Sequence, residues 1–257
     1  MCKIVYLHVI KIPNIMKKVS IIFVIMCAIC TLSAQSNSVK NEHSCGTVTD
    51  LDGNKYGTVL IGDQCWMKEN MRSTRLNDGS IISLGYNLSN APYRYNPDNN
   101  SANVQKYGYL YNLDAAKEIC PTGWRLPTLE ECVVLLNYCS EHYAVGGEFE
   151  NNAKALASTS GWKSSIEVNS VGCRQDDNDQ SGFSAFPAGI YNGTYKDFGR
   201  CAFFWSSTPY FRTQRVEEDI YDQELFHGVF INTYYKDAFV VCHWIREYGR
   251  SVRCIRE

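Results

Sequence analysis

Residues 120–139 read C-P-T-G-W-R-L-P-T-L-E-E-C-V-V-L-L-N-Y-C, and they contain the strongest helix signal in the chain. Thr128 and Glu131 form a capping box, in which each side chain accepts a hydrogen bond from the backbone N–H of the other residue. The side chains that follow recur at helical spacing, and they are Leu129, Cys132, Val133 and Leu136. We therefore predict a helix from Leu129 to Ser140.

Cys132 and Cys139 lie seven residues apart on this predicted helix. Two helical turns separate them by about 10 Å, which is beyond the reach of a disulfide bond. We expect each thiol either to pair elsewhere or to stay reduced as a small apolar side chain.

Shorter elements are predicted on both sides of this helix. Upstream, residues 46–67 read as two short strands joined by a turn at 52–54, and residues 73–106 read as a long surface segment. A short helix is expected from Asn112 to Ile119, because Pro121 cannot continue its hydrogen-bond ladder. Downstream we expect a third short helix at 152–158 and aromatic-rich strands near 183–186, 203–206, 229–233, 239–244 and 251–255.

The N-terminal residues predict export. Residues 19–34 form an apolar run that follows Lys17 and Lys18 and ends in small residues, as a secretory signal does. We predict that residues 1–34 are a signal peptide cleaved after Ala34, with Met16 as an alternative start. An uncleaved anchor is less favoured because the run is short for a membrane-spanning helix, and lipidation at Cys27 or Cys30 is less favoured because Ile29 is not small. Residues 35–44 read as a flexible tether.

Removal of the signal changes the composition of the chain. The 257 residues contain 12 cysteines and carry a formal net charge of -2, and this near-neutral balance argues against a nucleic-acid binder. The mature chain keeps 21 of the 25 basic residues and all 27 acidic ones, a net charge of -6. It also keeps nine cysteines, and export makes disulfides possible. Because nine is odd, at least one thiol stays free or pairs with another chain.

Six ordered blocks of sequence resemble a known family. They are 53–72 (G-N-K-Y-G-T-V-L-I-G-D-Q-C-W-M-K-E-N-M-R), 107–116 (Y-G-Y-L-Y-N-L-D-A-A), 120–128 (C-P-T-G-W-R-L-P-T), 181–189 (S-G-F-S-A-F-P-A-G), 204–208 (F-W-S-S-T) and 249–255 (G-R-S-V-R-C-I). Together they resemble the Fibrobacter succinogenes major paralogous domain, which occurs in exported proteins of Bacteroidetes and Fibrobacteres. The resemblance covers residues 45–257 as a single domain. Met71, where the family usually has Leu, and the acidic insert at 176–179 depart from the family pattern.

The resemblance implies an α+β fold similar to that of C-type lectin-like domains, with two main helices and short, loop-rich antiparallel strands. In that fold a cysteine at the first helix bonds to one on the last strand, and Cys120 and Cys254 occupy these places. Two further pairs are expected, Cys45 with Cys65, which flank the opening hairpin, and Cys173 with Cys201.

The mature chain lacks a recognisable catalytic constellation. Its histidines form no metal-ligand pair of the H-E-x-x-H type, and they are His43, His142, His227 and His243. The sequence has no G-x-S-x-G nucleophile elbow, and no basic or histidine-rich setting that would lower the pKa of a thiol. We predict a protein that is not an enzyme and needs no cofactor. A function as an oxidase-like or modifying enzyme, as among some C-type lectin-like relatives, is kept as an alternative.

An acidic run supplies the candidate metal site. It consists of Asp176, Asp177, Asn178 and Asp179, whose side-chain oxygens are of the kind that bind calcium. Calcium-dependent lectins carry a W-N-D-like strand, whereas the corresponding strand here reads Trp205-Ser206-Ser207, so that serines replace two ligands. A solvated acidic turn is the favoured interpretation, and bound calcium is the alternative.

Aromatic residues supply the candidate binding surface. The five tryptophans mostly fall inside the family blocks, so we assign them to the core. Tyrosines in irregular segments combine a flat apolar ring with a polar tip, which suits both sugars and protein partners. We expect these tyrosines to be exposed, and they are Tyr86, Tyr93, Tyr95, Tyr191, Tyr195, Tyr210 and Tyr221. Of these, Tyr191, Tyr195, Tyr210 and Tyr221 are the predicted binding residues.

We therefore predict a secreted or surface-exposed recognition domain. Its ligand would be a glycan, a cell-wall component or a surface protein, bound by loops around residues 165–225. The alternative is a structural surface or fimbria-associated subunit that contacts other copies or a fibre. We expect no nucleic-acid partner and no integral membrane segment after signal cleavage.

Overall fold

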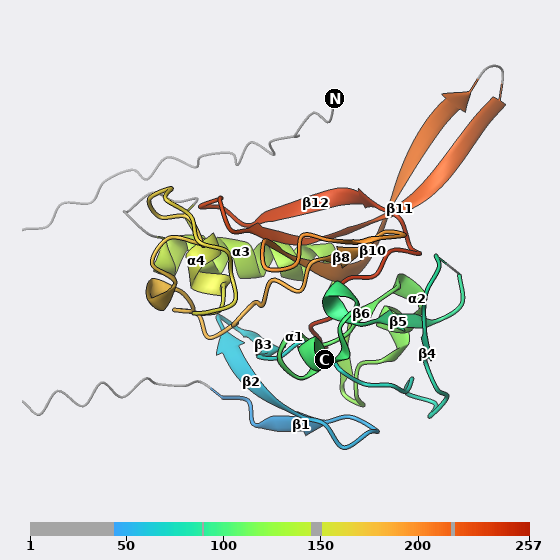
Figure 1. Cartoon of the computed structure of the whole chain (residues 1–257), viewed down its shortest axis with the longest axis horizontal. Helices are drawn as coiled ribbons and strands as arrows, with labels where there is room; N and C mark the ends of the chain where they lie inside the picture. The colour runs from blue at the N-terminus through green and yellow to red at the C-terminus, as the bar shows by residue number, and fades with distance from the viewer. Residues whose placement is uncertain (1–43, 89, 145–150, 217–218) are drawn as a thin grey trace, which may run out of the picture. The chain divides into compact units, whose positions relative to one another are not determined.

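The computed structural model of the chain describes residues 44–88, 90–144, 151–216 and 219–257, except for the side chains of 213–223 and 243 (Figure 1). The predicted signal peptide and almost all of the predicted tether lie outside these ranges. The described residues belong to one compact unit, which runs from residue 41 to residue 257. Within them, no helix has the length and hydropathy needed to cross a membrane.

In the first sheet, the last strand of the sequence lies between two strands from the N-terminal half of the chain. Its strands, in spatial order, are β1 (Thr47–Thr49), β2 (Lys55–Ile61), β3 (Gln64–Met67), β13 (Ile255–Arg256) and β7 (Trp124–Arg125). The turn predicted at 52–54 is confirmed, since Gly53 there has a φ of 81°. The second predicted strand is two strands, because Gly62, with a φ of 60°, turns the chain back between β2 and β3.

The second sheet contains the two longest strands of the protein's described part. β10 (Cys201–Val216), β11 (Asp219–Asn232) and β12 (Phe239–Trp244) pair in this order, all antiparallel. The strand predicted at 239–244 is confirmed. The loops expected between 207 and 228 are wrong, because both strands continue through them. Tyrosine, phenylalanine, threonine, valine and isoleucine recur in this stretch, and such residues favour strands.

β10 and β11 extend beyond the end of β12 as a two-stranded ribbon (Figure 1). Trp244, the last residue of β12, pairs with Phe226 of β11. The residues of β11 before Phe226 pair with β10 alone. We call residues 209–216 and 219–226 the arm, and the remaining described residues the body. The register between β10 and β11 shifts between Trp205 and Pro209, at the base of the arm.

Two small sheets complete the strand structure. One contains β4 (Ser83–Leu84), β5 (Tyr93–Tyr95) and β6 (Leu110–Tyr111), and the other contains β8 (Ile190–Tyr191) and β9 (Tyr195–Lys196). The segment 73–106, expected to be a long surface loop, also contributes to the core, since Ile82 and Tyr95 are fully buried. It continues through η1 (Pro97–Asn99), η2 (Ser101–Asn103) and α1 (Val104–Tyr107).

The predicted helices are present. α2 (Leu113–Glu118) and α4 (Ala153–Leu156) lie within their predicted ranges, and α3 (Leu129–Tyr143) begins at the predicted residue and runs three residues further. The capping box is confirmed: the Thr128 side chain accepts from the Glu131 N–H, and the Glu131 carboxylate accepts from the Thr128 N–H. Arg125 donates to both oxygens of that carboxylate, at 2.8 and 2.6 Å, which fixes the start of α3 against β7.

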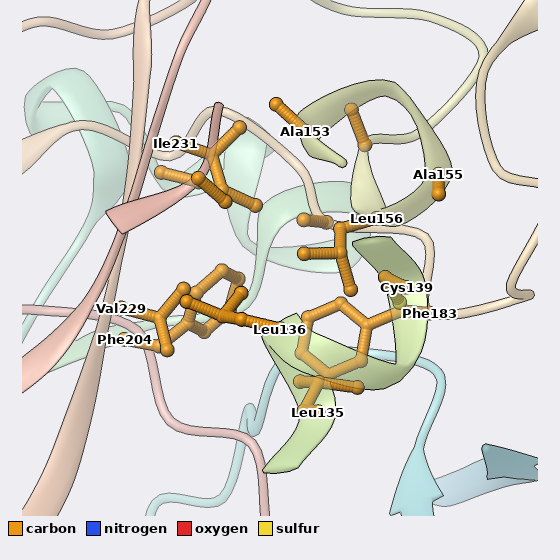
Figure 2. Packing of buried hydrophobic residues seen from close by; sticks show 14 of the residues in the cluster. Leu135, Leu136, Cys139, Ala153, Ala155, Leu156, Phe183, Phe204, Val229 and Ile231 are labelled. Atoms are coloured by element: carbon orange, nitrogen blue, oxygen red, sulfur yellow. The ribbon is translucent and has the colours of Figure 1, made fainter. Parts of the chain in front are cut away.

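The largest core cluster joins the helices to the second sheet, and Figure 2 shows ten of its residues by name. Leu135, Leu136 and Cys139 come from α3, and Ala153, Ala155 and Leu156 come from α4; Phe204, Val229 and Ile231 come from β10 and β11. Phe183 fills the centre, with its ring edge-on to Trp66 at 5.7 Å and to Phe204 at 5.6 Å. The segment 183–186 is not a strand, and only an isolated bridge at Ala185 joins it to Ala157.

Four tryptophans are buried, as predicted, and they are Trp66, Trp162, Trp205 and Trp244. Trp124 on β7 is half-buried. Trp205 donates from its indole N–H to the carbonyl of Tyr111 at 2.7 Å, so its one polar atom is satisfied in the core.

Arg253 joins its own segment to two others, 67–70 and 183–184, although it is only 1% exposed. Its Nε donates to the Asn70 side-chain oxygen at 2.7 Å. Its Nη atoms donate to the carbonyls of Met67 at 3.0 Å, of Ser184 at 2.8 Å and of Phe183. Burial lowers the pKa of Arg253 to about 9, so the guanidinium stays charged at neutral pH.

Arg250 is buried in a different way, since it is 2% exposed and is covered by aromatic rings. Its guanidinium carbon lies 4.0 Å from the ring centroid of Trp244 and 4.6 Å from that of Trp205. Cation–π attraction therefore replaces part of the hydration that this charge loses on burial.

Two of the three predicted disulfides are present. Cys45 bonds to Cys65, and Cys120 bonds to Cys254. The predicted bond between Cys173 and Cys201 is wrong, because both residues keep free thiols. Cys201 is buried at the start of β10, where the Asn232 amide donates to its sulfur at 3.3 Å. Cys132 and Cys139 are buried thiols within the largest core, as small apolar side chains are.

Candidate recognition site

A continuous row of four tyrosine rings joins the two small sheets. Tyr93 and Tyr95 come from β5, Tyr191 comes from β8, and Tyr195 comes from β9. The ring centroids of Tyr93 and Tyr95 are 6.5 Å apart, those of Tyr95 and Tyr191 are 4.1 Å apart, and those of Tyr191 and Tyr195 are 4.9 Å apart. We call these four residues the tyrosine row.

Two glycines allow the central ring of the row to enter the core. A Cβ atom at Gly85 would lie 2.5 Å from the Tyr95 ring, and one at Gly249 would lie 2.6 Å from it. No side chain fits at either distance, so the backbone on both sides can contact the ring only because these residues are glycines. Gly249 also fixes β8, since the Tyr191 N–H donates to its carbonyl at 3.0 Å.

The row is buried at its centre and accessible at its ends. Tyr95 and Tyr191 are 0% and 3% exposed, whereas Tyr93 and Tyr195 are half-buried. Tyr86, in the loop after β4, is 76% exposed. The Tyr191 hydroxyl donates to the backbone carbonyl of Tyr86 at 2.6 Å, which places the backbone of this loop beside the row.

The hydroxyl groups of Tyr95, Tyr191 and Tyr195 stay protonated at neutral pH. Burial raises the pKa of Tyr195, and the nearby hydroxyls of Tyr191 and Tyr86 raise it further. Burial also raises the pKa of Tyr95 and of Tyr191. The half-buried Tyr195 end of the row therefore offers an uncharged phenol, which can donate and accept hydrogen bonds beside an apolar ring face.

The structure places the four predicted binding tyrosines in different settings. Tyr191 is buried, so the expectation that it is exposed is wrong, and Tyr195 is half-buried at the end of the row. Tyr210 is half-buried at the base of the arm, with its ring edge-on to His227 at 5.6 Å. The side chain of Tyr221 lies outside the described residues. Of the wider set of tyrosines, Tyr86 is exposed near Tyr195, and Tyr93 forms the opposite end of the row.

The acidic run does not gather its side chains around one point. Asp176 and Asp177 are exposed in η4 (Gln175–Asp177), whereas Asn178 is buried. The Asn178 amide donates to the carbonyls of Ser158 and Val171 at 3.0 and 3.2 Å, and Asp179 accepts from the Ser184 N–H at 2.7 Å. Among the described residues, no group of three or more His, Cys, Asp or Glu side chains could hold a metal ion. Calcium binding here stays a prediction.

A lysine holds the loop that precedes this run. Lys154 of α4 is 3% exposed, and its ammonium donates to the carbonyls of Cys173 at 2.6 Å, Arg174 at 3.2 Å and Ser170 at 3.4 Å. Burial lowers its pKa, and the charge of Asp177 opposes that shift. Three carbonyl oxygens thus converge on a positive charge that the chain itself supplies.

Three of the free thiols that the structure describes are in unreactive settings. Burial raises the pKa of the Cys132, Cys139 and Cys201 thiols to about 12, so they are protonated and poor nucleophiles at neutral pH. The ring Nδ1 of His142 lies 2.9 Å from the Tyr138 carbonyl within α3. His43 and the side chain of His243 lie outside the described residues.

One shallow hollow lies away from the tyrosine row, beside the β1–β2 turn. Its volume is about 160 Å³, and its polar lining includes Asp50, Ser73 and Arg75. Pockets that enclose small-molecule ligands are typically about 300–1,000 Å³, so the tyrosine row is the stronger candidate for recognition.

The described residues define a mixed α+β protein that consists mostly of antiparallel sheets with few helices. The chain belongs to the Fibrobacter succinogenes major domain family, whose model matches residues 59–256. No curated protein and no solved structure matches the chain.

Proposed function

We propose that this protein is an exported, non-catalytic recognition domain that binds a neutral glycan at the Tyr195 end of the tyrosine row. We also propose that its fold is C-type lectin-like. In this proposal the ligand is bound by aromatic rings instead of by a calcium site. The observation that carries the proposal is the exposed Tyr86 near half-buried Tyr195, at one end of a row whose two central rings, Tyr95 and Tyr191, are buried and stacked.

The chemistry of this surface suits a sugar. The face of a tyrosine ring packs against the C–H groups of a pyranose, and the phenol hydroxyl bonds to sugar hydroxyls. The base of the row is already ordered by stacking and by hydrogen bonds, so binding would cost little conformational entropy. A mature chain with a net charge of -6 disfavours an acidic ligand.

The protonated thiols support a role without catalysis. A nucleophilic cysteine needs a lowered pKa, whereas burial raises the pKa of Cys132, Cys139 and Cys201. The two disulfides, Cys45–Cys65 and Cys120–Cys254, are consistent with folding in an oxidising compartment.

A glycan array and a panel of surface proteins, each probed with and without calcium, test the proposal. We expect binding to a neutral glycan that does not need calcium. Tyr86→Ala and Tyr195→Ala should each weaken it by about tenfold or more, as substitutions at an interface hot spot do. Tyr234→Ala is the matched control, because Tyr234 is 43% exposed in the turn between β11 and β12.

Three results would contradict the proposal. They are no binding to any glycan, calcium-dependent binding that both tyrosine variants retain, and equal losses in Tyr86→Ala and Tyr234→Ala. Thermal unfolding of each variant separates a lost ligand contact from a lost fold.

A further inference from the structure

The arm leaves two strand edges unpaired within the described part of the chain. Residues 209–216 of β10 and 219–225 of β11 pair with each other, and neither has a second strand partner among the described residues. Each outer edge therefore presents backbone N–H and C=O groups that can pair with another strand. Phe211, at 63% exposed, lies on this ribbon.

A two-stranded ribbon is marginally stable by itself in water. Among the arm residues whose side chains the structure describes, 209–212 and 224–226, only Phe226 belongs to one of the three core clusters. Addition of a further strand to one edge supplies main-chain hydrogen bonds that the ribbon lacks. The arm is thus a surface that gains from a partner.

The two edges carry opposite charge. β10 has two arginines between 209 and 216, Arg212 and Arg215, and no acidic residue there. β11 has three acidic residues between 219 and 226, Asp219, Asp222 and Glu224, and no basic residue there. The β10 edge of one copy therefore complements the β11 edge of another.

The spacing of these charges fits one antiparallel register. Arg212 and Arg215 are three residues apart, and so are Asp222 and Asp219. When Arg212 of one copy lies opposite Asp222 of another, Arg215 lies opposite Asp219 in the same ladder. Opposite charges that face each other across two strands stabilise the pair, and like charges destabilise it.

We propose that the arm joins copies of this chain edge to edge, with β10 of one copy antiparallel to β11 of the next. A symmetric dimer through β10 alone or β11 alone would bring like charges together instead. The proposed contact uses two different edges, so every added copy leaves one edge of each kind open. Such a heterologous contact builds a ring or a filament rather than a closed dimer. This inference is independent of glycan binding at the tyrosine row.

Charge exchange tests the proposal on the full chain. One variant, Arg212→Glu with Arg215→Glu, makes both edges acidic, and a second, Asp219→Arg with Asp222→Arg, makes both edges basic. A third variant combines all four changes and so exchanges the charges of the two edges. Inside the arm none of the four residues faces an oppositely charged partner, because their partners are Gln223, Ile220, Val216 and Thr213.

Analytical ultracentrifugation over a range of concentrations gives the readout. We expect wild-type protein to form species larger than a dimer, which dissociate as salt rises. Each double variant should associate about tenfold more weakly or worse, and both an equimolar mixture of the two and the fourfold variant should assemble again. Circular dichroism confirms that each variant is folded.

The proposal is overturned if the wild type stays monomeric up to its solubility limit. It is also overturned if a closed dimer forms, or if assembly is unchanged in both double variants. Glycan binding by a monomeric protein would leave the proposed recognition function standing while removing this one.

Discussion

The body and the arm are stabilised by different kinds of interaction. The body contains two disulfides, three core clusters and the hydrogen-bonded Arg253. The arm consists of one antiparallel ladder, and of its described side chains only Phe226, at the base, belongs to one of those clusters. We infer from this difference that stability, which depends on residues of the body, and the proposed assembly, which depends on residues of the arm, can be changed separately.

Loss of the Cys120–Cys254 disulfide should have the largest effect on the body. This bond links residues 134 positions apart, and in the chain-entropy model such a closure contributes about 4–5 kcal/mol. We expect Cys120→Ala with Cys254→Ala to lose that free energy of unfolding in urea titrations. Cys45→Ala with Cys65→Ala removes a disulfide between residues only 20 positions apart, and it should lower the free energy of unfolding by about 3 kcal/mol. Equal losses would show that loop length does not govern the difference.

Arg253→Met should have the next largest effect. The change removes the donors to Asn70, Met67, Phe183 and Ser184 and leaves buried acceptors without partners. We expect a loss of about 3–4 kcal/mol in chemical unfolding, as for other broken buried networks. Arg256→Met is the control, because Arg256 is exposed on β13 and should change stability by less than about 0.5 kcal/mol. Similar losses in both variants would refute the special role of Arg253.

Lys154→Met should have an intermediate effect on the body. The substitution keeps the length of the side chain and removes the charge on which three carbonyls converge. We expect a loss of about 2 kcal/mol and faster amide hydrogen exchange in residues 170–174. Lys236→Met, at an exposed position, is the control. Unchanged exchange in 170–174 would mean that the ammonium does not order this loop.

Shortening the arm should have the smallest effect on stability. Deletion of 212–223, with Asn-Gly joining Phe211 to Glu224, keeps a register pair and supplies a favourable two-residue turn. We expect the free energy of unfolding to change by less than about 0.5 kcal/mol, while sedimentation shows a monomer. A large loss of stability would remove the distinction between arm and body.

Local signals made parts of this fold predictable from the sequence. The start of α3 follows from Thr128 and Glu131, which satisfy each other's backbone within four residues. β12 was also predictable locally, because its residues from Phe239 to Trp244 are mostly aromatic or β-branched, and such residues favour strands. The two disulfides that the structure contains were expected partly from family resemblance and partly from flanking positions, since spacing alone leaves pairing open.

Other features depend on contacts between distant segments. The burial of Tyr191 requires Tyr95 and Gly249, which are far from it in sequence, so an irregular local context suggested exposure wrongly. Cys173 and Cys201 could not be excluded as a pair because pairing depends on the distance between their Cα atoms. The arm was missed because its charged and polar residues resemble a loop when the ladder is unknown.

The position of β13 sets the order in which this chain can fold. β13 is the last strand in sequence, yet it lies between β3 and β7, and Arg253 and Cys254 directly before it complete the body. The first sheet therefore cannot join β3 to β7 until residues 253–256 are in place. Pairing at such sequence separation is slow, so we expect this part of the body to form late in folding.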